Sequence, residues 1–141
     1  MKILHFPQVK STMDEARRAI EGGHIPPFLL LADRQTEGRG RLEGRRWESG
    51  PGASLAMTLC LDPSISLSPA LPLRVGLGVA QRLCGLEGLS RRIALKWPND
   101  ILGLGTAEGG WKKLGGILCE STGSGFFIGI GINLKREAYG P

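Results

Sequence analysis

The sequence has few of the residues that build metal sites and disulfide frameworks. Its three cysteines, Cys60, Cys84 and Cys119, lie far apart, each inside an apolar run. Neither of its two histidines has a cysteine or histidine neighbour at ligand spacing, which argues against a zinc site. An odd number of widely spaced cysteines is typical of reduced thiols, so we expect buried cysteines and a cytoplasmic location.

Long apolar runs and repeats are missing too. No stretch is long enough to span a bilayer and no signal peptide is recognisable, so we expect no association with a membrane. The 141 residues contain no internal repeat or linker, and they predict a single domain, 1–141. The net charge of +5 favours acidic partners, but no lysine-rich tail concentrates it.

Glycine, in contrast, is abundant. The 22 glycines are about twice the usual share of roughly 7%, and many lie in 38–44, 103–116 and 123–131. Glycine lets the backbone turn sharply and approach a ligand closely. This distribution indicates ligand-binding loops and bends in strands, and it argues against a helical bundle.

The segment 33–47, here named the arginine loop, combines glycine with positive charge. Arginine offers a planar, permanently charged fork to carboxylates and phosphates. We interpret the segment as a loop that closes over a small anion; a nucleic-acid-binding loop and a solvated basic loop are the alternatives. Four of its five arginines lie among its glycines: Arg39, Arg41, Arg45 and Arg46.

Apolar periodicity and helix caps predict an α+β protein with a mixed sheet and its helices packed on one side. The first helix has two overlapping capping patterns, Thr12 with Glu15 and Ser11 with Asp14. The predicted strands are 1–6, 28–33, 54–61, 93–97, 101–102, 113–120 and 126–134, and the predicted helices are 12–21 and 70–84.

Four short clusters have both a structural and a functional interpretation. The hydroxyls of Ser11 and Thr12 either cap the first helix or hold polar atoms of a ligand. The sequence Lys-Trp-Pro-Asn-Asp at 96–100 is a tight turn or part of a site at a strand end. Two glycines at 115–116 indicate a β-bulge or a ligand against the strand. Glycine alternates with isoleucine at 129–133, which suits a flat ligand or a crowded sheet crossing.

Taken in order along the chain, these clusters resemble the motifs of biotin–protein ligases. The resemblance runs from the first strand to near the end of the chain, and it implies the class II aminoacyl-tRNA synthetase/biotin ligase fold. The motifs are Ser11-Thr12, Gln35, Gly-Arg-Gly-Arg at 38–41, Gly-Arg-Arg-Trp at 44–47, Lys-Trp-Pro-Asn-Asp at 96–100, Lys-Leu-Gly-Gly-Ile-Leu-Cys-Glu at 113–120 and Gly-Ile-Gly-Ile-Asn at 129–133.

The resemblance implies an ATP-dependent ligation in two steps. Biotin and ATP form biotinyl-5′-AMP, and a lysine of a biotin carrier domain then takes the biotinyl group. The implied catalytic residues are Lys113, Arg41 and Arg39. The implied biotin-binding residues are Ser11, Thr12, Met13, Gln35, Arg39, Gly40, Arg41, Lys113, Gly115, Gly116, Gly129 and Gly131. The implied ATP-binding residues are Arg45, Trp47, Lys96, Asn99, Asp100 and Asn133, with no metal bound directly by the protein and Mg²⁺ carried by ATP near Asp100.

The sequence departs from the family pattern in several places. Met13 stands where the family often has asparagine, Leu42-Glu43 lengthen the arginine loop by one residue, and 103–110 is a long insertion. No helix-turn-helix precedes the first strand, so DNA binding is not expected. The chain ends eight residues after Asn133, where the family continues with further helices and often a small β-barrel.

Three other functions fit part of the pattern. A lipoate or octanoate ligase shares the implied fold, and a non-catalytic binder of biotin or its adenylate would suit a shortened chain. A nucleic-acid module would explain the arginine loop but not Gln35, Lys113 or the strand 129–133. A homodimer formed through sheet edges is a further property that the resemblance implies.

Overall fold

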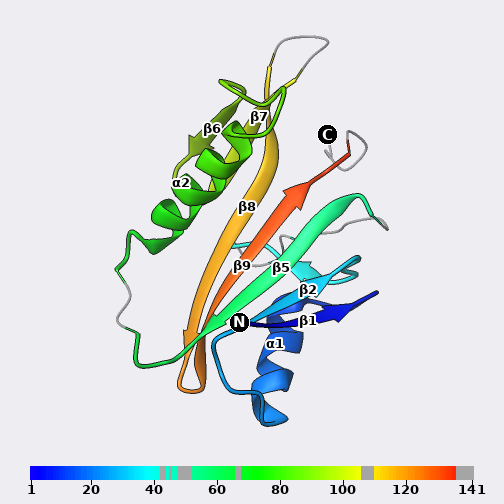
Figure 1. Cartoon of the computed structure of the whole chain (residues 1–141), viewed down its shortest axis with the longest axis vertical. Coiled ribbons are helices and arrows are strands. Elements are labelled where there is room, and N and C mark those ends of the chain that lie inside the picture. Colours follow the sequence, from blue (N-terminus) through cyan, green and yellow to red (C-terminus); the bar gives the residue numbers. More distant parts are fainter. Residues whose placement is uncertain (42–43, 45, 48–51, 66–67, 106–109, 136–141) are drawn as a thin grey trace.

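Within the described residues, seven strands form one mixed sheet in the order β1-β2-β5-β9-β8-β7-β6 (Figure 1). The computed structural model describes residues 1–41, 44, 46–47, 52–65, 68–105 and 110–135. The pair β1–β2 is parallel and the other neighbouring pairs are antiparallel, so the predicted α+β class with a mixed sheet is confirmed. The strands of this sheet are β1 (Lys2–Phe6), β2 (Phe28–Ala32), β5 (Ser54–Leu61), β6 (Ile93–Lys96), β7 (Asp100–Leu104), β8 (Trp111–Thr122) and β9 (Gly125–Asn133).

Helix α1 (Thr12–Glu21) is the crossover between the parallel strands β1 and β2. Its N-cap is Ser11, whose hydroxyl accepts a hydrogen bond from the backbone N–H of Asp14 at 3.5 Å. The capping pattern of Ser11 with Asp14 is therefore confirmed. The pattern of Thr12 with Glu15 is wrong, because Thr12 already lies in the first turn and its hydroxyl donates to another side chain.

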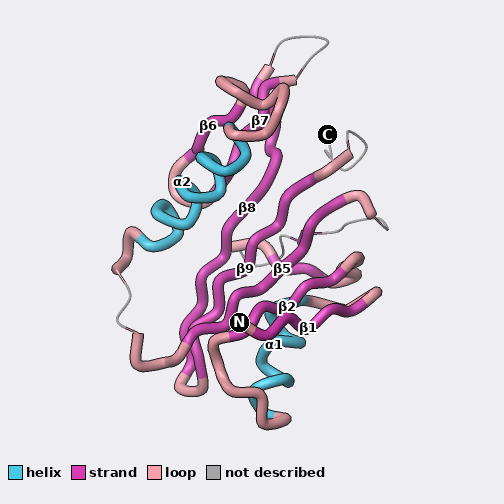
Figure 2. The backbone as a smooth tube through the Cα atoms, in the orientation of Figure 1, coloured by secondary structure: helices cyan, strands magenta, loops and turns pink. Residues whose placement is uncertain are grey.

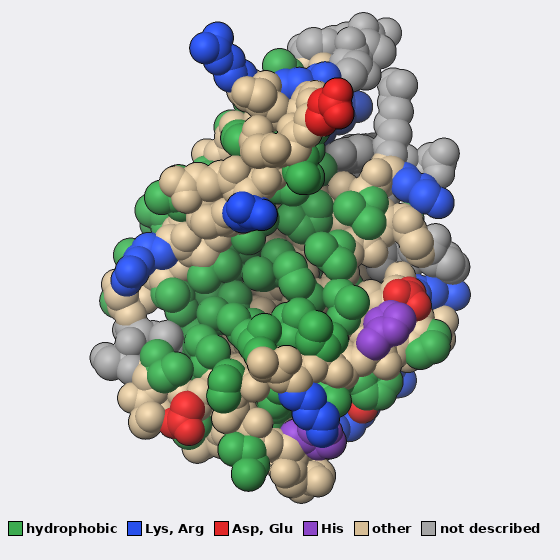
Figure 3. Space-filling view, in the orientation of Figure 1, with side chains coloured by type: hydrophobic (Ala, Val, Ile, Leu, Met, Phe, Trp, Pro, Cys, Tyr) green, Lys and Arg blue, Asp and Glu red, His purple; other side chains and the backbone are tan. Residues whose placement is uncertain are grey.

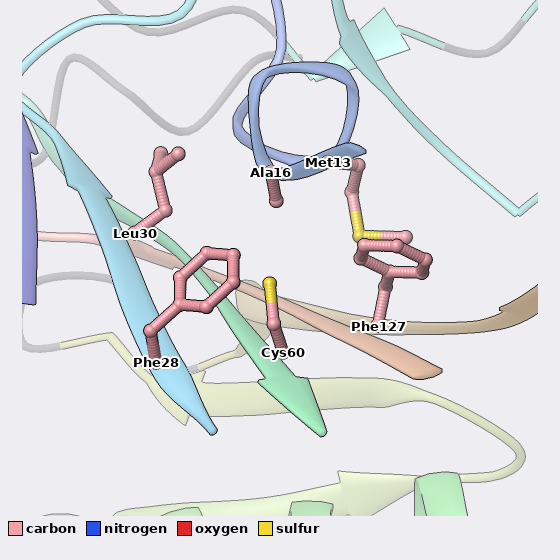
Figure 4. Close-up of a cluster of buried hydrophobic side chains, with 6 residues drawn as sticks. All are labelled: Met13, Ala16, Phe28, Leu30, Cys60 and Phe127. Atoms are coloured by element: carbon pink, nitrogen blue, oxygen red, sulfur yellow. The ribbon is translucent and has the colours of Figure 1, made fainter. Parts of the chain in front are cut away.

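Helix α2 (Leu71–Cys84) packs against the opposite face of the sheet from α1, so the prediction that both helices lie on one side is wrong. Along β5, Cys60 packs with Met13 and Ala16 of α1, whereas Leu59 belongs to the core cluster that α2 covers. Figure 4 shows Ala16 pointing from α1 toward Cys60, and Met13 pointing from α1 to the ring of Phe127. Successive residues of a strand point to opposite faces of the sheet. Because successive residues such as Leu59 and Cys60 are both apolar, both faces are apolar and each is covered by its own helix.

The two helices cover different strands as well as different faces. Helix α1 contacts β2, β5 and β9, and α2 contacts β6, β7 and β8 (Figure 2). An added Cβ at Gly76 of α2 would lie 3.3 Å from Cδ1 of Ile117, so this helix lies close to the sheet. Beside α2, hydrophobic side chains gather over the middle of the sheet face (Figure 3). Neither helix in the described ranges is long and apolar enough to cross a membrane.

The arginine loop contains a short antiparallel ribbon of β3 (Gly38–Arg39) and β4 (Arg46–Trp47). At Gly38, an added Cβ would clash with the backbone carbonyl of Trp47, so only glycine fits this crossing. The sequence predicted only a loop here, because two-residue strands leave no periodic pattern. Leu42, Glu43 and Arg45 lie outside the described residues.

Candidate active site

A pocket opens on the α1 face of the sheet, between the start of α1, the arginine loop and strands β8 and β9. We refer to it as the glycine-floored pocket. Four of its lining residues were not predicted: Met57 of β5, and Ile117, Leu118 and Ile130, which lie close to predicted positions on β8 and β9. Its other lining residues were all predicted: Ser11, Thr12, Met13, Gln35, Arg39, Gly40, Arg41, Trp47, Asn99, Lys113, Gly116, Gly129 and Gly131.

The floor of this pocket is bare strand backbone onto which side chains from other elements pack. An added Cβ at Gly129 would lie 2.9 Å from Sδ of Met13, and one at Gly131 would lie 2.7 Å from Cε2 of Trp47. The missing side chains thus let the thioether and the indole reach the strand. Among the described residues, the buried indole Nε1–H of Trp47 has no hydrogen-bond acceptor.

A β-bulge in β8 turns Lys113 into the pocket. Ile101 of β7 pairs with Gly115, but the next pair shifts to Lys113, which leaves Leu114 as the extra residue. Strict alternation without this bulge would place Lys113 on the face of Ile117, which packs in the core under α2. The bulge that the sequence suggested near 115–116 is confirmed, one residue earlier at Leu114, and it turns Lys113 toward the pocket.

The ammonium group of Lys113 already has two partners. Its Nζ lies 2.7 Å from Oδ1 of Asp100 and 5.8 Å from the centre of the Trp47 ring. The lysine side chain is 45% exposed and that of Asp100 is 24% exposed. A partly exposed pair of this kind is worth little to stability. The lysine is therefore free to exchange its carboxylate partner for an anionic ligand.

A buried hydrogen-bonded wall closes the pocket at the start of α1. Both the backbone N–H and the hydroxyl of Thr12 donate to Oε1 of Gln35, at 2.7 and 2.9 Å. The hydroxyl of Thr58 donates in turn to that of Thr12 at 2.9 Å. All three residues are buried, so these hydrogen bonds fix the polar wall in place. The sequence analysis missed Thr58, a polar residue in the otherwise apolar strand β5.

The two arginines that line the pocket differ in their surroundings. The guanidinium of Arg39 lies between two carboxylates, with Nη2 at 2.8 Å from Oδ1 of Asp14 and 3.5 Å from Oε2 of Glu120. Its charge is therefore compensated within the protein. Arg41 follows Gly40 and is exposed at the pocket rim.

Two predicted residues from the glycine-rich strands lie outside the pocket lining. The Cβ position of Gly115 is 2.7 Å from the carbonyl oxygen of Gly131, on the α2 side, so glycine is required there for strand packing. The side chain of Asn133 donates to the carbonyl of Lys113 at 3.4 Å and joins the end of β9 to the start of β8.

Of the three site residues predicted at the turn between β6 and β7, only one lines the pocket. Asn99 lines the pocket, and its Nδ2 donates to the carbonyl of Ile117 at 3.1 Å. Lys96 is exposed and Asp100 is paired with Lys113, and neither is part of the lining. Arg45, the remaining predicted ATP ligand, lies outside the described residues.

None of the three cysteines lines the pocket. Burial raises the pKa of Cys60 to about 12 and that of Cys119 to about 11. Such thiols stay protonated near neutral pH and are poor nucleophiles. Cys60 is buried as predicted, whereas Cys84 and Cys119 are partly exposed. Within the described ranges, no three His, Cys, Asp or Glu side chains group as metal ligands.

A model of the biotin/lipoate A/B protein ligase family matches residues 6–136. The chain belongs to this family. The bifunctional ligase/repressor BirA of Bacillus spizizenii is 36% identical over 143 residues, which cover 96% of this chain and 41% of that protein.

Two solved structures of biotin protein ligases are similar in fold. The Aquifex aeolicus protein, in complex with biotin and ATP, has a TM-score of 0.74 and 35% identity, over 96% of this chain and 53% of that one. The Leishmania major protein, in complex with biotinyl-5-AMP, has a TM-score of 0.74 and 37% identity, over 94% of this chain and 57% of that one. The chain thus spans roughly half the length of the family members it matches.

Proposed function

We propose that this chain carries the biotin-activating centre of an ATP-dependent biotin–protein ligase. The observation that supports this most strongly is the bulge at Leu114, which places the ammonium of Lys113 in the glycine-floored pocket with Arg41 at its rim. Two anions, a carboxylate and a triphosphate, must meet in the first step of such a ligation. A pocket with a bare floor, a fixed polar wall and two cations suits that task.

In the first step, a carboxylate oxygen of biotin attacks the α-phosphorus of ATP. The bond from the α-phosphorus to the bridging oxygen breaks, and pyrophosphate leaves with that electron pair. Lys113 and Arg41 stabilise the negative charge shared by the two reactants, which is the main electrostatic contribution in transfers of this kind. Thr12 and Gln35 hold the wall against which the non-reacting part of biotin lies.

In the second step, the neutral amine of a carrier lysine attacks the acyl carbon of biotinyl-5′-AMP. The acyl–oxygen bond breaks, AMP leaves, and the amine loses a proton as the amide forms. The arginine loop covers the mixed anhydride until the carrier arrives, which excludes water. We assign Trp47 and Asn99 to the nucleotide, because both line the pocket and the Trp47 ring lies 5.8 Å from Nζ of Lys113.

Mg²⁺ belongs to this proposal as a partner of ATP. Asp100 is a carboxylate close to Lys113, and Mg²⁺ in such sites is held by one or two carboxylates and the substrate phosphates. Asp100 would have to release Lys113 to contribute, so the ion and the lysine would compete for this carboxylate. A cytoplasmic location and a dimer through sheet edges stay predictions.

The test is incubation of the chain with biotin, ATP and Mg²⁺, with pyrophosphate release and labelling of a biotin carrier domain as separate measurements. We expect both signals with biotin and neither with lipoate or octanoate. Release of pyrophosphate without labelling of the carrier domain would limit the function to activation of biotin. Biotin binding without pyrophosphate would support the non-catalytic binder instead.

A further inference from the structure

The ion pairs around Arg39 join three parts of the chain that are far apart in sequence. Asp14 in the first turn of α1 accepts from Arg39 at 2.8 Å and also from Arg17 at 2.8 Å. Glu120 of β8 accepts from the second nitrogen of Arg17 and lies 3.5 Å from Arg39. Arg17 also lies over the Phe127 ring, 5.1 Å from its centre.

This cluster has two positive and two negative side chains, and three of them belong to the rigid part of the fold. Asp14 and Arg17 are on α1 and Glu120 is on the central part of the sheet, whereas Arg39 is on the ribbon of the arginine loop. Because Arg39 also lines the pocket, its position determines where the start of the loop sits over the floor.

We propose that Asp14 and Glu120, supported by Arg17, form an ionic latch that holds strand β3 at the pocket through Arg39. This proposal rests on the proposed function and deepens it. Asp14 and Glu120 are positioning residues, and the guanidinium of Arg39 serves to anchor the loop. Lys113 and Arg41 then remain as the cations that meet the reacting anions.

The ion pairs of the latch are individually weak. The four side chains are between 24% and 41% exposed, so each pair is weakened by solvent. Loss of one carboxylate should therefore accelerate escape of a bound acyl-adenylate about two- to fivefold, with a smaller effect on its formation.

The experiment measures dissociation of a non-hydrolysable sulfamate analogue of biotinyl-AMP from the full chain. Asp14→Asn and Glu120→Gln should release it faster, and Asp14→Glu should stay close to wild type because it keeps the carboxylate. Glu15→Gln is the matched control, since Glu15 pairs with Arg18 at 2.8 Å one position along the same helix, outside the pocket. Thermal unfolding of each variant separates loss of the latch from loss of the fold.

A double-mutant cycle with Arg39→Gln completes the test. If Asp14 acts through Arg39, the double variant releases the analogue no faster than the more affected single variant. Additive effects, or Asp14→Asn rates equal to those of Glu15→Gln, would overturn the latch. Wild-type chain that binds the analogue but releases no pyrophosphate would refute catalysis and leave the latch standing, whereas failure to bind the analogue would refute both.

Discussion

Lys113 and Asp100 form an ion pair of 2.7 Å between β8 and β7, at the edge of a pocket whose floor is bare backbone. The pair holds the ammonium group in place before any ligand arrives. An incoming carboxylate or phosphate can then replace the aspartate, or share the ammonium group with it, with little reorganisation of the protein.

Replacing Lys113 by alanine should sharply reduce adenylate formation. A charge-assisted hydrogen bond is worth about 1.5–3 kcal/mol, which corresponds to a roughly 10- to 100-fold loss in rate or binding. Lys112→Ala is the matched control, because Lys112 is exposed and is not part of the pocket lining. Pyrophosphate release at the wild-type rate in Lys113→Ala would refute the assignment.

Arg41→Gly should impair retention of the intermediate more than its formation. The loop would close less well, so biotinyl-5′-AMP should escape and label lysines of bystander proteins. Release of labelled adenylate into solution is the measurement. Limited proteolysis around 38–46 gives a second one: cleavage should slow when biotin and ATP are added, and an unchanged rate would contradict the gating role.

Gly115→Ala should destabilise the fold rather than block the pocket. Its new methyl group would meet the carbonyl of Gly131, which is backbone and cannot move aside cheaply, at 2.7 Å. We expect a loss of about 1–3 kcal/mol in the free energy of unfolding. Gly103→Ala, where the nearest atom is a Leu114 carbon at 3.5 Å, should cost less. Equal denaturation midpoints for the two variants would show that Gly115 is not crowded.

The free energy of unfolding should fall at alkaline pH because of Cys60. Burial raises its folded pKa to about 12, above the value of roughly 8.5 for an unfolded thiol. The stabilisation is therefore complete below about pH 8.5 and is lost as the pH rises toward 12, by at most about 1.4 kcal/mol per pH unit. Urea unfolding at several alkaline pH values measures this fall, and the free energy of unfolding of Cys60→Ala should decrease less steeply with pH than that of the wild type. Identical slopes would contradict the role of this thiol.

Motif order predicted which residues meet, but not which way each of them points. Ser11, Gln35 and Gly131 come together as expected because each follows or interrupts a strong apolar element. The orientation of Lys113 depends on one extra residue, Leu114, and a bulge leaves almost no trace in residue type. Ordinary strand alternation separates Gly116, which lines the pocket, from Gly115 on the α2 face.

The apolar pattern of the sequence also did not predict which face of the sheet each helix covers. An amphipathic helix shows that it covers an apolar surface, but both faces of this sheet are apolar. The position of α1 follows from its short links to two parallel strands. The position of α2 depends on where β5 ends and β6 begins, which are long-range features of the chain.

The alternation of glycine and isoleucine in β9 has a practical consequence for redesigning the pocket for other ligands. Odd positions such as Gly129 and Gly131 face the pocket, and even positions such as Ile128 and Ile132 pack under α2. Directed evolution toward larger or smaller ligands should therefore randomise Met13, Trp47, Gly129 and Gly131 only. Libraries that also vary the even positions would lose most of their members to misfolding before any selection for specificity begins.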